Sequence, residues 1–212
     1  MFKRFEKNLI GKDYVCGDLH GCFSMLEKEL KKIHFNFKID RLFCVGDLAD
    51  RGPESKFALY YLRKPWFYSV LGNHEDIFLQ CHRDKTSDFS WHLRNGGEWL
   101  IHESEEWIEE YIEEIEKLPL AIQVGDIGIV HARTPEGVNW NTVISNLDDP
   151  DIRKTLLWGR HDSPKVDDIK VIYAGHTINE LITYYGSIKD IDTGAYFQYY
   201  NYSYGKLSIC EL

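Results

Sequence analysis

The chain has 212 residues, is 43% hydrophobic and 28% charged, and carries a formal net charge of −9. This composition is typical of a globular protein with a sizeable core, and the length predicts a single domain over residues 1–212. No apolar run approaches the roughly 18 residues of a membrane span, and Lys and Arg form no cluster like those of nucleic-acid binders. We therefore expect neither a membrane nor a nucleic acid as a partner.

The first third of the chain alternates between short apolar runs and segments with helical spacing. The predicted strands cover residues 13–16, 41–45 and 66–71, and the predicted helices cover 23–34 and 55–63 and begin again near His74. Strands and helices that alternate over short connections are typical of parallel strands joined by right-handed crossovers. We expect these three strands to lie parallel in one sheet.

The middle of the chain is predicted to be mostly helical. Trp107, Tyr111, Ile115 and Leu118 fall on one stripe of a helix over residues 103–118. Eight glutamates and one lysine lie within the same segment, so most of the net charge of the chain belongs to it. We interpret the segment as an amphipathic helix with a solvated acidic face rather than as a recognition element.

The second half returns to strands, which predicts an α/β fold with a later antiparallel portion. The predicted strands cover residues 121–124, 127–130, 170–174, 181–185 and 187–191, with two more runs within 196–209. The last segment is rich in aromatic residues, which we interpret as core and edge packing rather than as a stacking platform. They are Tyr196, Phe197, Tyr199, Tyr200, Tyr202 and Tyr204.

The cysteines indicate a reducing compartment. Five are present, an odd number, without a CxxC pair or a regular spacing: Cys16, Cys22, Cys44, Cys81 and Cys210. The N-terminus lacks the apolar stretch of a secretory signal, so a disulfide framework is not expected. We predict a cytoplasmic location, with Cys16 and Cys44 as small buried hydrophobes.

Four turns share one pattern, in which a strand is followed by glycine and then by side chains that bind metals. They read GDLHG at 17–21, GDLADRG at 46–52, GNHE at 72–75 and GHT at 175–177. His20 and Asp47 lie 27 positions apart and Asp47 and Asn73 lie 26 apart, about one strand–helix–strand unit each. The first three turns therefore fall at the carboxyl edge of neighbouring parallel strands, where open α/β sheets place their sites.

The candidate ligands offer only oxygen and imidazole nitrogen, a set that suits Mn²⁺, Fe or Zn²⁺ rather than a structural cysteine site. Alone, an Asp-x-His turn is more often a hydrogen-bonded pair, and a single histidine more often belongs to the core. Together, six ligands are enough for two ions that share one carboxylate and clamp a phosphoryl group. The six are Asp18, His20, Asp47, Asn73, His131 and His176.

This motif set resembles that of the calcineurin-like metallophosphoesterases, in the phosphoprotein phosphatase branch with its bacterial and phage members. The resemblance runs from about residue 12 to the end and includes NGG at 95–97, LWGR at 157–160 and IDTGA at 191–195. It implies a four-layer α/β/β/α sandwich of two mixed β-sheets flanked by helices.

The resemblance also implies roles for individual residues. Asp18, His20 and Asp47 would hold a first divalent metal ion, and Asp47, Asn73, His131 and His176 would hold a second. The ions would be Mn²⁺ in vitro, or Fe or Zn²⁺. Arg51 and Arg160 would grip the phosphate through planar forks of donors. His74, oriented by Asp50, would protonate the leaving alcohol.

The implied activity is hydrolysis of phosphoserine and phosphothreonine, and also of phosphotyrosine, by direct attack of a metal-bridging hydroxide. The substrate would be a phosphoprotein or a small phosphoester. The alternative is a dinucleoside tetraphosphate hydrolase, whose motifs are similar, although Asp50 and Glu75 favour the phosphatase. A third hypothesis, an inactive binding module on the same scaffold, requires a missing ligand or acid, and none is missing.

Arg133, in the sequence HARTP at 131–135, has no role implied by the resemblance. Its charge either shapes the choice of substrate or forms a surface ion pair.

Overall fold

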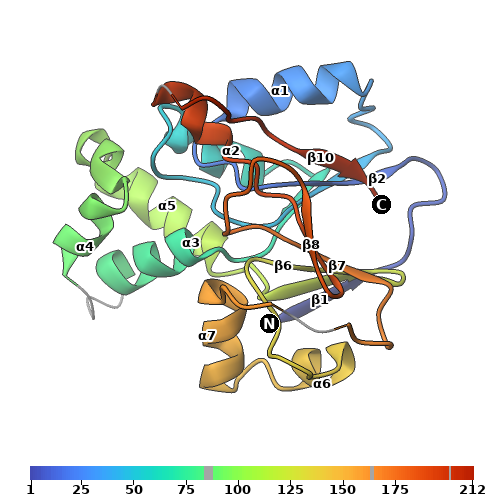
Figure 1. Ribbon diagram of the computed structural model, residues 1–212. Coiled ribbons are helices and arrows are strands. Elements are labelled where there is room, and N and C mark those ends of the chain that lie inside the picture. Colours follow the sequence, from blue (N-terminus) through green and yellow to red (C-terminus); the bar gives the residue numbers. More distant parts are fainter. Residues whose placement is uncertain (84–87, 163–164, 201) are drawn as a thin grey trace.

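The computed structural model describes residues 1–83, 88–162, 165–200 and 202–212. Its strands form two sheets, which lie face to face between two layers of helices (Figure 1).

The first sheet has four strands in the order β10-β2-β3-β4. β2 (Asp13–Cys16), β3 (Arg41–Cys44) and β4 (Phe67–Ser69) run parallel, and β10 (Ile209–Glu211) is antiparallel to β2. The helices between the parallel strands are α1 (Phe23–Lys32) and α2 (Ala58–Leu62), the latter preceded by a 3₁₀ turn. The predicted strand–helix alternation is confirmed.

The second sheet has six strands in the order β1-β5-β6-β7-β9-β8. The hairpin of β5 and β6 and the strands β7, β8 and β9 fall where the sequence predicts them. The strands are β1 (Phe2–Phe5), β5 (Ala121–Val124), β6 (Ile127–Val130), β7 (Val171–Ala174), β8 (Thr183–Tyr185) and β9 (Ile188–Asp190). β1 was not predicted; it pairs parallel to β5 at the edge of the sheet.

The packing of the sheets explains why their strands read as continuous apolar runs. Along β2, Tyr14 and Cys16 pack with the flanking helices, whereas Val15 faces the other sheet. Successive side chains of a strand point to opposite faces, so a strand covered on both sides is apolar throughout. Cys16 and Cys44 are both fully buried, as predicted.

The apolar residues between the two sheets form what we call the inter-sheet core. Its buried members come from both sheets and from the residues that end their strands. They are Val15, Phe43, Val45, Val70, Ile122, Val124, Ile127, Ile129, Tyr173 and Ile191.

Helices cover the outer face of each sheet, as the four-layer prediction requires. α1, α2 and α5 (Glu105–Ile115) pack over the four-stranded sheet. α6 (Trp140–Ser145) and α7 (Pro150–Trp158) cover the six-stranded sheet from the opposite side (Figure 1). None of the helices in the described parts of the chain is long and apolar enough to cross a membrane.

The prediction of two strands within residues 196–209 is wrong. A 3₁₀ helix, η4 (Ala195–Tyr199), follows Gly194, which has the left-handed backbone φ of 70°. Among the described residues of this segment, 196–200 and 202–209, only Ile209 lies in a strand, at the start of β10. Phe197 is buried, but Tyr199, Tyr200 and Tyr202 are exposed. The aromatic residues of this segment therefore do not indicate strands packed in a sheet.

No element was predicted from the sequence for residues 131–169, where α6 and α7 lie. Their start carries a readable signal, because the Asp149 side chain accepts hydrogen bonds from the backbone of Asp151 and Ile152, and Pro150 occupies the first helical position. An aspartate followed by proline is a common helix start.

Candidate metal centre and active site

The six predicted metal ligands converge at one edge of the two sheets. The turns after β2 and β3 and the start of α3 (Asn73–Phe78) provide four of them, and the residues after β6 and β7 provide two. None of the six exposes more than 7% of its surface: Asp18, His20, Asp47, Asn73, His131 and His176. Buried polar side chains at this density require partners or a bound ion.

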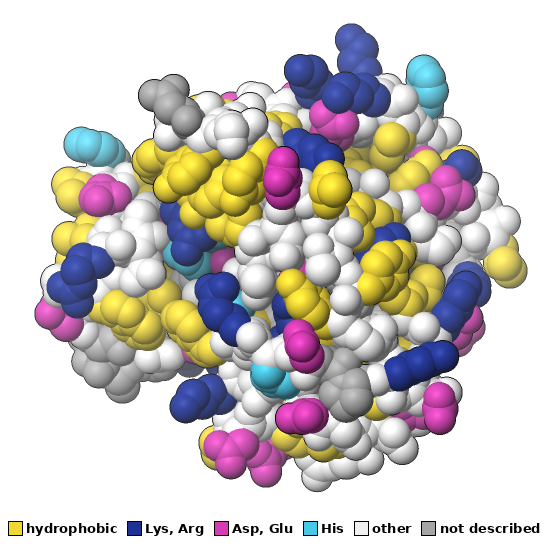
Figure 2. All heavy atoms as spheres, in the orientation of Figure 1, with side chains coloured by type: hydrophobic (Ala, Val, Ile, Leu, Met, Phe, Trp, Pro, Cys, Tyr) yellow, Lys and Arg dark blue, Asp and Glu magenta, His cyan; other side chains and the backbone are white. Residues whose placement is uncertain are grey.

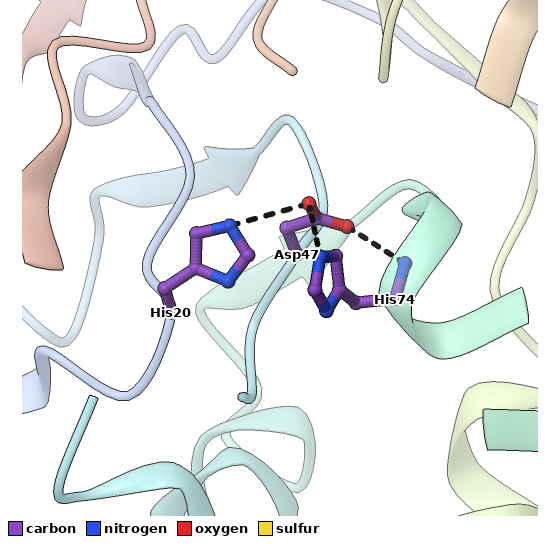
Figure 3. Close-up of side chains that lie close together, drawn as sticks. All are labelled: His20, Asp47 and His74. Atoms are coloured by element: carbon purple, nitrogen blue, oxygen red, sulfur yellow. Dashed lines mark hydrogen bonds and ion pairs between the residues drawn. The ribbon is translucent and has the colours of Figure 1, made fainter. Parts of the chain in front are cut away.

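Asp47 belongs to two groups of side chains whose ligand atoms all lie within 4.8 Å of one another. The first group is His20, Asp47 and His74, and the second group is Asp47, His131 and His176. In the first group, Nε2 of His20 and of His74 lie 3.3 and 3.9 Å from Asp47 Oδ2 (Figure 3). In the second, His131 Nε2 lies 3.5 Å from Asp47 Oδ1. One carboxylate thus faces two sets of imidazoles.

Asn73 and Asp18 lie beside the second group. Asn73 Oδ1 is 2.7 Å from His131 Nε2 and 2.9 Å from His176 Nδ1. The Asp18 carboxylate accepts a hydrogen bond from the backbone N–H of His176 at 3.1 Å. The ligand groups found among the described residues do not include Asp18, although the family resemblance assigned it to the first ion.

The imidazoles are held in the tautomer that a metal ligand needs. Nδ1 of His20 lies 3.0 Å from the carbonyl of Ala49, and Nδ1 of His131 lies 2.8 Å from the carbonyl of Val45. Because a carbonyl only accepts, each Nδ1 carries the proton and each Nε2 keeps its lone pair. Burial lowers the pKa of both rings, which favours the neutral form.

These lone pairs fit a divalent cation. The Nε2 lone pair of His131 points at Asn73 Oδ1, which is also an acceptor, so a hydrogen bond cannot explain their approach. His176 Nε2 is buried and has no hydrogen-bond partner among the described residues. Burial lowers the pKa of His176 to about 2, so this nitrogen also offers a lone pair. A bound cation would satisfy these acceptor atoms, which converge without a proton between them.

The backbone at the site is strained. Among the described residues, six that are not glycine have a positive φ, and five of these belong to the predicted site: His20 (42°), Asp47 (52°), Asp50 (70°), Arg51 (69°) and His176 (68°). Such conformations are costly and cluster at functional sites. Gly175 allows a close approach instead, since a Cβ there would lie 1.9 Å from Asp18 Oδ1.

The predicted acid and its orienting carboxylate are in contact. His74 Nδ1 lies 2.7 Å from Asp50 Oδ2, so it donates its proton there and Nε2 faces the ligand groups. Burial by itself would lower the pKa of His74, but the carboxylates of Asp47 and Asp50 raise it above its usual value. Arg51 donates to Nε2 of both His20 and His74 at 2.8 Å and lies over the ring of Tyr196.

Glu75 has a structural role at the site that the sequence analysis did not assign. Its carboxylate accepts hydrogen bonds from the backbone N–H groups of Asp47, Leu48 and Gly72, at 2.9–3.0 Å. It therefore ties the turn after β3 to the start of α3. Burial and the nearby Asp47 carboxylate raise the pKa of Glu75 to about 7.

His92 and Trp99 also reach the site, and neither was predicted from the sequence. His92 lies on α4 (Phe89–Arg94), and Trp99 lies on the 3₁₀ helix η3 (Gly97–His102). Both contact the Asp50 carboxylate. No motif pointed to His92, although Trp99 follows the NGG run that the family resemblance includes.

The two arginines beyond Arg51 differ. Arg160 is exposed, and its positive charge contributes to the low pKa of His131 and His176. Arg133 is only 1% exposed and pairs with the buried Asp190 at 2.8 Å. Of the two alternatives for Arg133, the surface ion pair is therefore wrong, because the pair with Asp190 is buried.

Arg133 also supports the segment that carries Arg160. Its Nε donates to the carbonyl of His161 at 3.2 Å, and a Cβ at Gly159 would lie 2.7 Å from the Arg133 side chain. The Arg133 side chain therefore contacts Gly159 and His161, the two residues that flank Arg160 in the sequence.

Figure 2 shows a hollow between the part of the molecule that carries α4 and the rest, with Lys or Arg and His side chains at its base. Hydrophobic side chains gather along its rim.

Known proteins match most of this chain. Residues 14–206 match the family model described as calcineurin-like phosphoesterase. The serine/threonine-protein phosphatase 1 of Salmonella typhimurium is 32% identical over 209 residues, which cover 93% of each protein. A symmetrical bis(5'-nucleosyl)-tetraphosphatase of Shewanella sp. is 43% identical over 81 residues, which cover 35% of this chain and 30% of that protein.

A solved structure has the same fold. The protein serine/threonine phosphatase from Saccharomyces cerevisiae superposes with a TM-score of 0.64 at 19% identity, over 89% of this chain and 70% of that one.

Proposed function

The chain belongs to the calcineurin-like phosphoesterase family, and on that premise we propose that it is a metal-dependent phosphatase of phosphoserine and phosphothreonine in proteins, acting also on phosphotyrosine. One observation carries the proposal: the His74–Asp50 pair lies directly beside two ligand groups that share Asp47. An alkyl phosphate needs charge on its phosphoryl oxygens and a proton on its leaving oxygen, and this arrangement provides for both.

The six ligands would hold two divalent cations, with Asp47 shared between them. Asp18 and His20 would complete the first site, and Asn73, His131 and His176 the second. Mn²⁺ is the ion we expect in vitro, and Fe or Zn²⁺ also suit this nitrogen and oxygen set. When bound, the cations supply positive charge to the phosphoryl oxygens and an activated water for direct attack on phosphorus.

The arginines would bind the phosphoryl group. The Arg51 guanidinium contacts the rings of His20 and His74, both of which belong to the first group. A phosphate is a stronger acceptor than an imidazole, so Arg51 would turn to it and release Nε2 of His74. Arg160, exposed beside the second group, would contact the remaining oxygens.

His74 would then donate a proton from Nε2 to the leaving alcohol. Asp50 keeps Nδ1 protonated and fixes the ring, and the nearby carboxylates favour the imidazolium form. An acid with a raised pKa remains loaded near neutral pH, which a poor leaving group requires.

A dinucleoside tetraphosphatase is the second candidate, because 81 residues match such an enzyme at 43% identity. Against it, the serine/threonine-protein phosphatase matches over 93% of the chain. We further propose a single domain, a cytoplasmic location and a phosphoprotein or small phosphoester as the substrate.

The two candidates are separated by a direct comparison of substrates. The protein is stripped with a chelator, reloaded with Mn²⁺, Fe²⁺ or Zn²⁺, and assayed on phosphoserine, phosphothreonine and phosphotyrosine peptides and on diadenosine tetraphosphate. We expect activity to return with metal and kcat/KM to favour a phosphopeptide. A strong preference for the dinucleotide would replace the first proposal with the second.

A further inference from the structure

The Asp50 carboxylate receives N–H donors from three side chains, not from His74 alone. His74 Nδ1 lies 2.7 Å from Oδ2, and Trp99 Nε1 donates to Oδ1 at 2.8 Å. His92 Nε2 lies 3.0 and 3.1 Å from the two oxygens. These donors occupy both oxygens of the Asp50 carboxylate, which is 1% exposed. The carboxylate is therefore held in one orientation.

The proton positions along this network are determined by its chemistry. An ionised carboxylate only accepts, so His92 donates to it from Nε2. His92 is fully buried, and its Nδ1 lies 3.2 Å from Nε2 of His82. The contacts therefore run from His82 through His92 to Asp50, and His74 donates to the same carboxylate.

The position of the His92 ring depends on close packing. A Cβ at position 97 would lie 2.6 Å from the ring, so the imidazole fits only because Gly97 has no side chain. The rings of Phe78 and Phe89 lie 5.4 and 6.4 Å from it. The ring has little room to turn away from Asp50, and its donor is directed at the carboxylate.

We propose that His92, assisted by Trp99, is a positioning residue that fixes the Asp50 carboxylate and so aims His74 at the leaving group. The inference rests on the proposed phosphatase function and extends it to a segment outside the sheets, since α4 and η3 provide both donors. Within the described parts of the chain, the His92 side chain makes its hydrogen-bond contacts with Asp50 and His82, not with the six predicted metal ligands. It acts through Asp50, whose backbone φ of 70° is already strained.

The test uses the dependence of kcat on the leaving group. p-Nitrophenolate leaves without a proton, whereas phenolate and the serine alkoxide need one. For His92→Phe, which keeps the ring packing but has no donor, we expect kcat to fall about 10–100-fold on phenyl phosphate and on a phosphoserine peptide. On p-nitrophenyl phosphate we expect a change of no more than about threefold.

Two further variants separate positioning from packing. His92→Gln places an amide donor near the same point and should recover most of the loss on the phosphoserine peptide. His82→Phe keeps the His92 donor but removes its partner, so its loss should be smaller than that of His92→Phe. In a His74→Asn background, His92→Phe should add almost nothing, because residues that act through one another are not additive.

A spectroscopic readout is independent of turnover. The Nδ1 proton of His74, bonded to Asp50, should give a downfield NMR signal that moves in His92→Phe and stays near its place in His92→Gln. Thermal unfolding of each variant checks that the fold is kept.

The outcomes are distinct. Equal losses of kcat on all substrates would mean that His92 has only a packing role, and an unchanged kcat on all substrates would mean that Asp50 does not need His92; either result overturns the inference while the proposed function stands. A metal-loaded wild type without activity on any phosphomonoester would overturn the proposed function, and this inference with it.

Discussion

The two ligand groups that share Asp47 differ in how they are assembled. The first group, with His20 and His74, comes from turns that follow neighbouring strands of the four-stranded sheet. The second group adds His131 and His176, which follow β6 and β7 of the six-stranded sheet. The first group is therefore built by local strand–helix–strand geometry, whereas the second exists only because the two sheets pack through the inter-sheet core.

The spacing of candidate ligands along the sequence therefore predicts only part of this site. Intervals of 27 and 26 residues follow from one strand–helix–strand unit each, and they bring His20, Asp47 and Asn73 to one edge. No such interval links Asp47 to His131 or His176. Their convergence depends on the register of two different sheets.

The largest effect is expected where the groups meet. Asp47→Asn should lower the affinity for both cations and reduce kcat by about 10⁴-fold, because bound cations stabilise the transition state by several kcal/mol. Elemental analysis after gel filtration measures the cations retained.

Asp40→Asn is the matched control, because Asp40 is also buried and its carboxylate accepts hydrogen bonds from the backbone N–H groups of Lys12 and Asn36. It should retain both ions. Loss of a single ion from Asp47→Asn would contradict a shared ligand.

His74→Asn tests whether the first group does more than bind metal. His74 belongs to that group by distance, and its hydrogen bond to Asp50 is the basis of the proposed role in proton transfer. We expect kcat to fall by about 10²–10⁴-fold on a phosphoserine peptide and much less on p-nitrophenyl phosphate. Comparable losses on both substrates, or loss of a cation, would instead assign His74 to metal binding.

A pair of variants compares the two groups directly. His20→Gln and His131→Gln each remove one ring, from the first and the second group respectively. Each variant should lower the affinity for one cation and leave the affinity for the other nearly unchanged. The loss should be at least about 10–100-fold, which is the usual cost of removing a residue that only supports a metal ligand. Calorimetric titration of the metal-free protein with Mn²⁺ would measure the two affinities. Parallel weakening of both ions in both variants would mean that the groups do not bind independently.

The smallest expected effect is on the acid stability of the network behind the first group. Burial and the nearby His92 lower the pKa of His82 to about 4, from its ordinary value of 6.5. Between pH 6.5 and 4 the unfolded chain therefore binds a proton at His82 that the folded chain does not, so the free energy of unfolding falls as pH falls.

The His82→Gln variant has no such proton. Urea unfolding at several pH values should show a shallower loss of stability for this variant than for the wild type across that window. If the free energy of unfolding depends on pH equally in both proteins, His82 does not contribute to the loss of stability in this window.

Where local pattern decides the structure, prediction from the sequence was accurate. Residues 13–16, 121–124 and 127–130 form strands with the predicted bounds. β1 was missed because Lys3 and Arg4 interrupt its apolar residues, and an edge strand with two exposed residues carries little signal. The aromatic segment after Gly194 was misread because aromatic residues favour strands only when a neighbouring strand is available.

Within the site, the motifs identified the residues whose side chains lie on tight turns. They did not identify the supports, which come from elsewhere in the chain. His92 reaches Asp50 across 42 positions, and Arg133 reaches Asp190 across 57. A lone histidine or arginine at such a distance has no local pattern, because its role depends on which buried partner the fold places opposite it.

The sequence by itself predicted the chemistry at this edge: side chains with nitrogen and oxygen atoms that could bind metals on glycine turns, a candidate acid preceded by its carboxylate, and strands spaced to place three turns together. Only the tertiary structure decided that one carboxylate faces both sets of imidazoles, that Arg133 is buried, and that α4 and η3 hold Asp50 in place. The physical reason is that side-chain types and turn spacings are properties of short segments. The convergence of side chains from two sheets, and the burial of the hydrogen bonds between them, depend on how the whole chain packs.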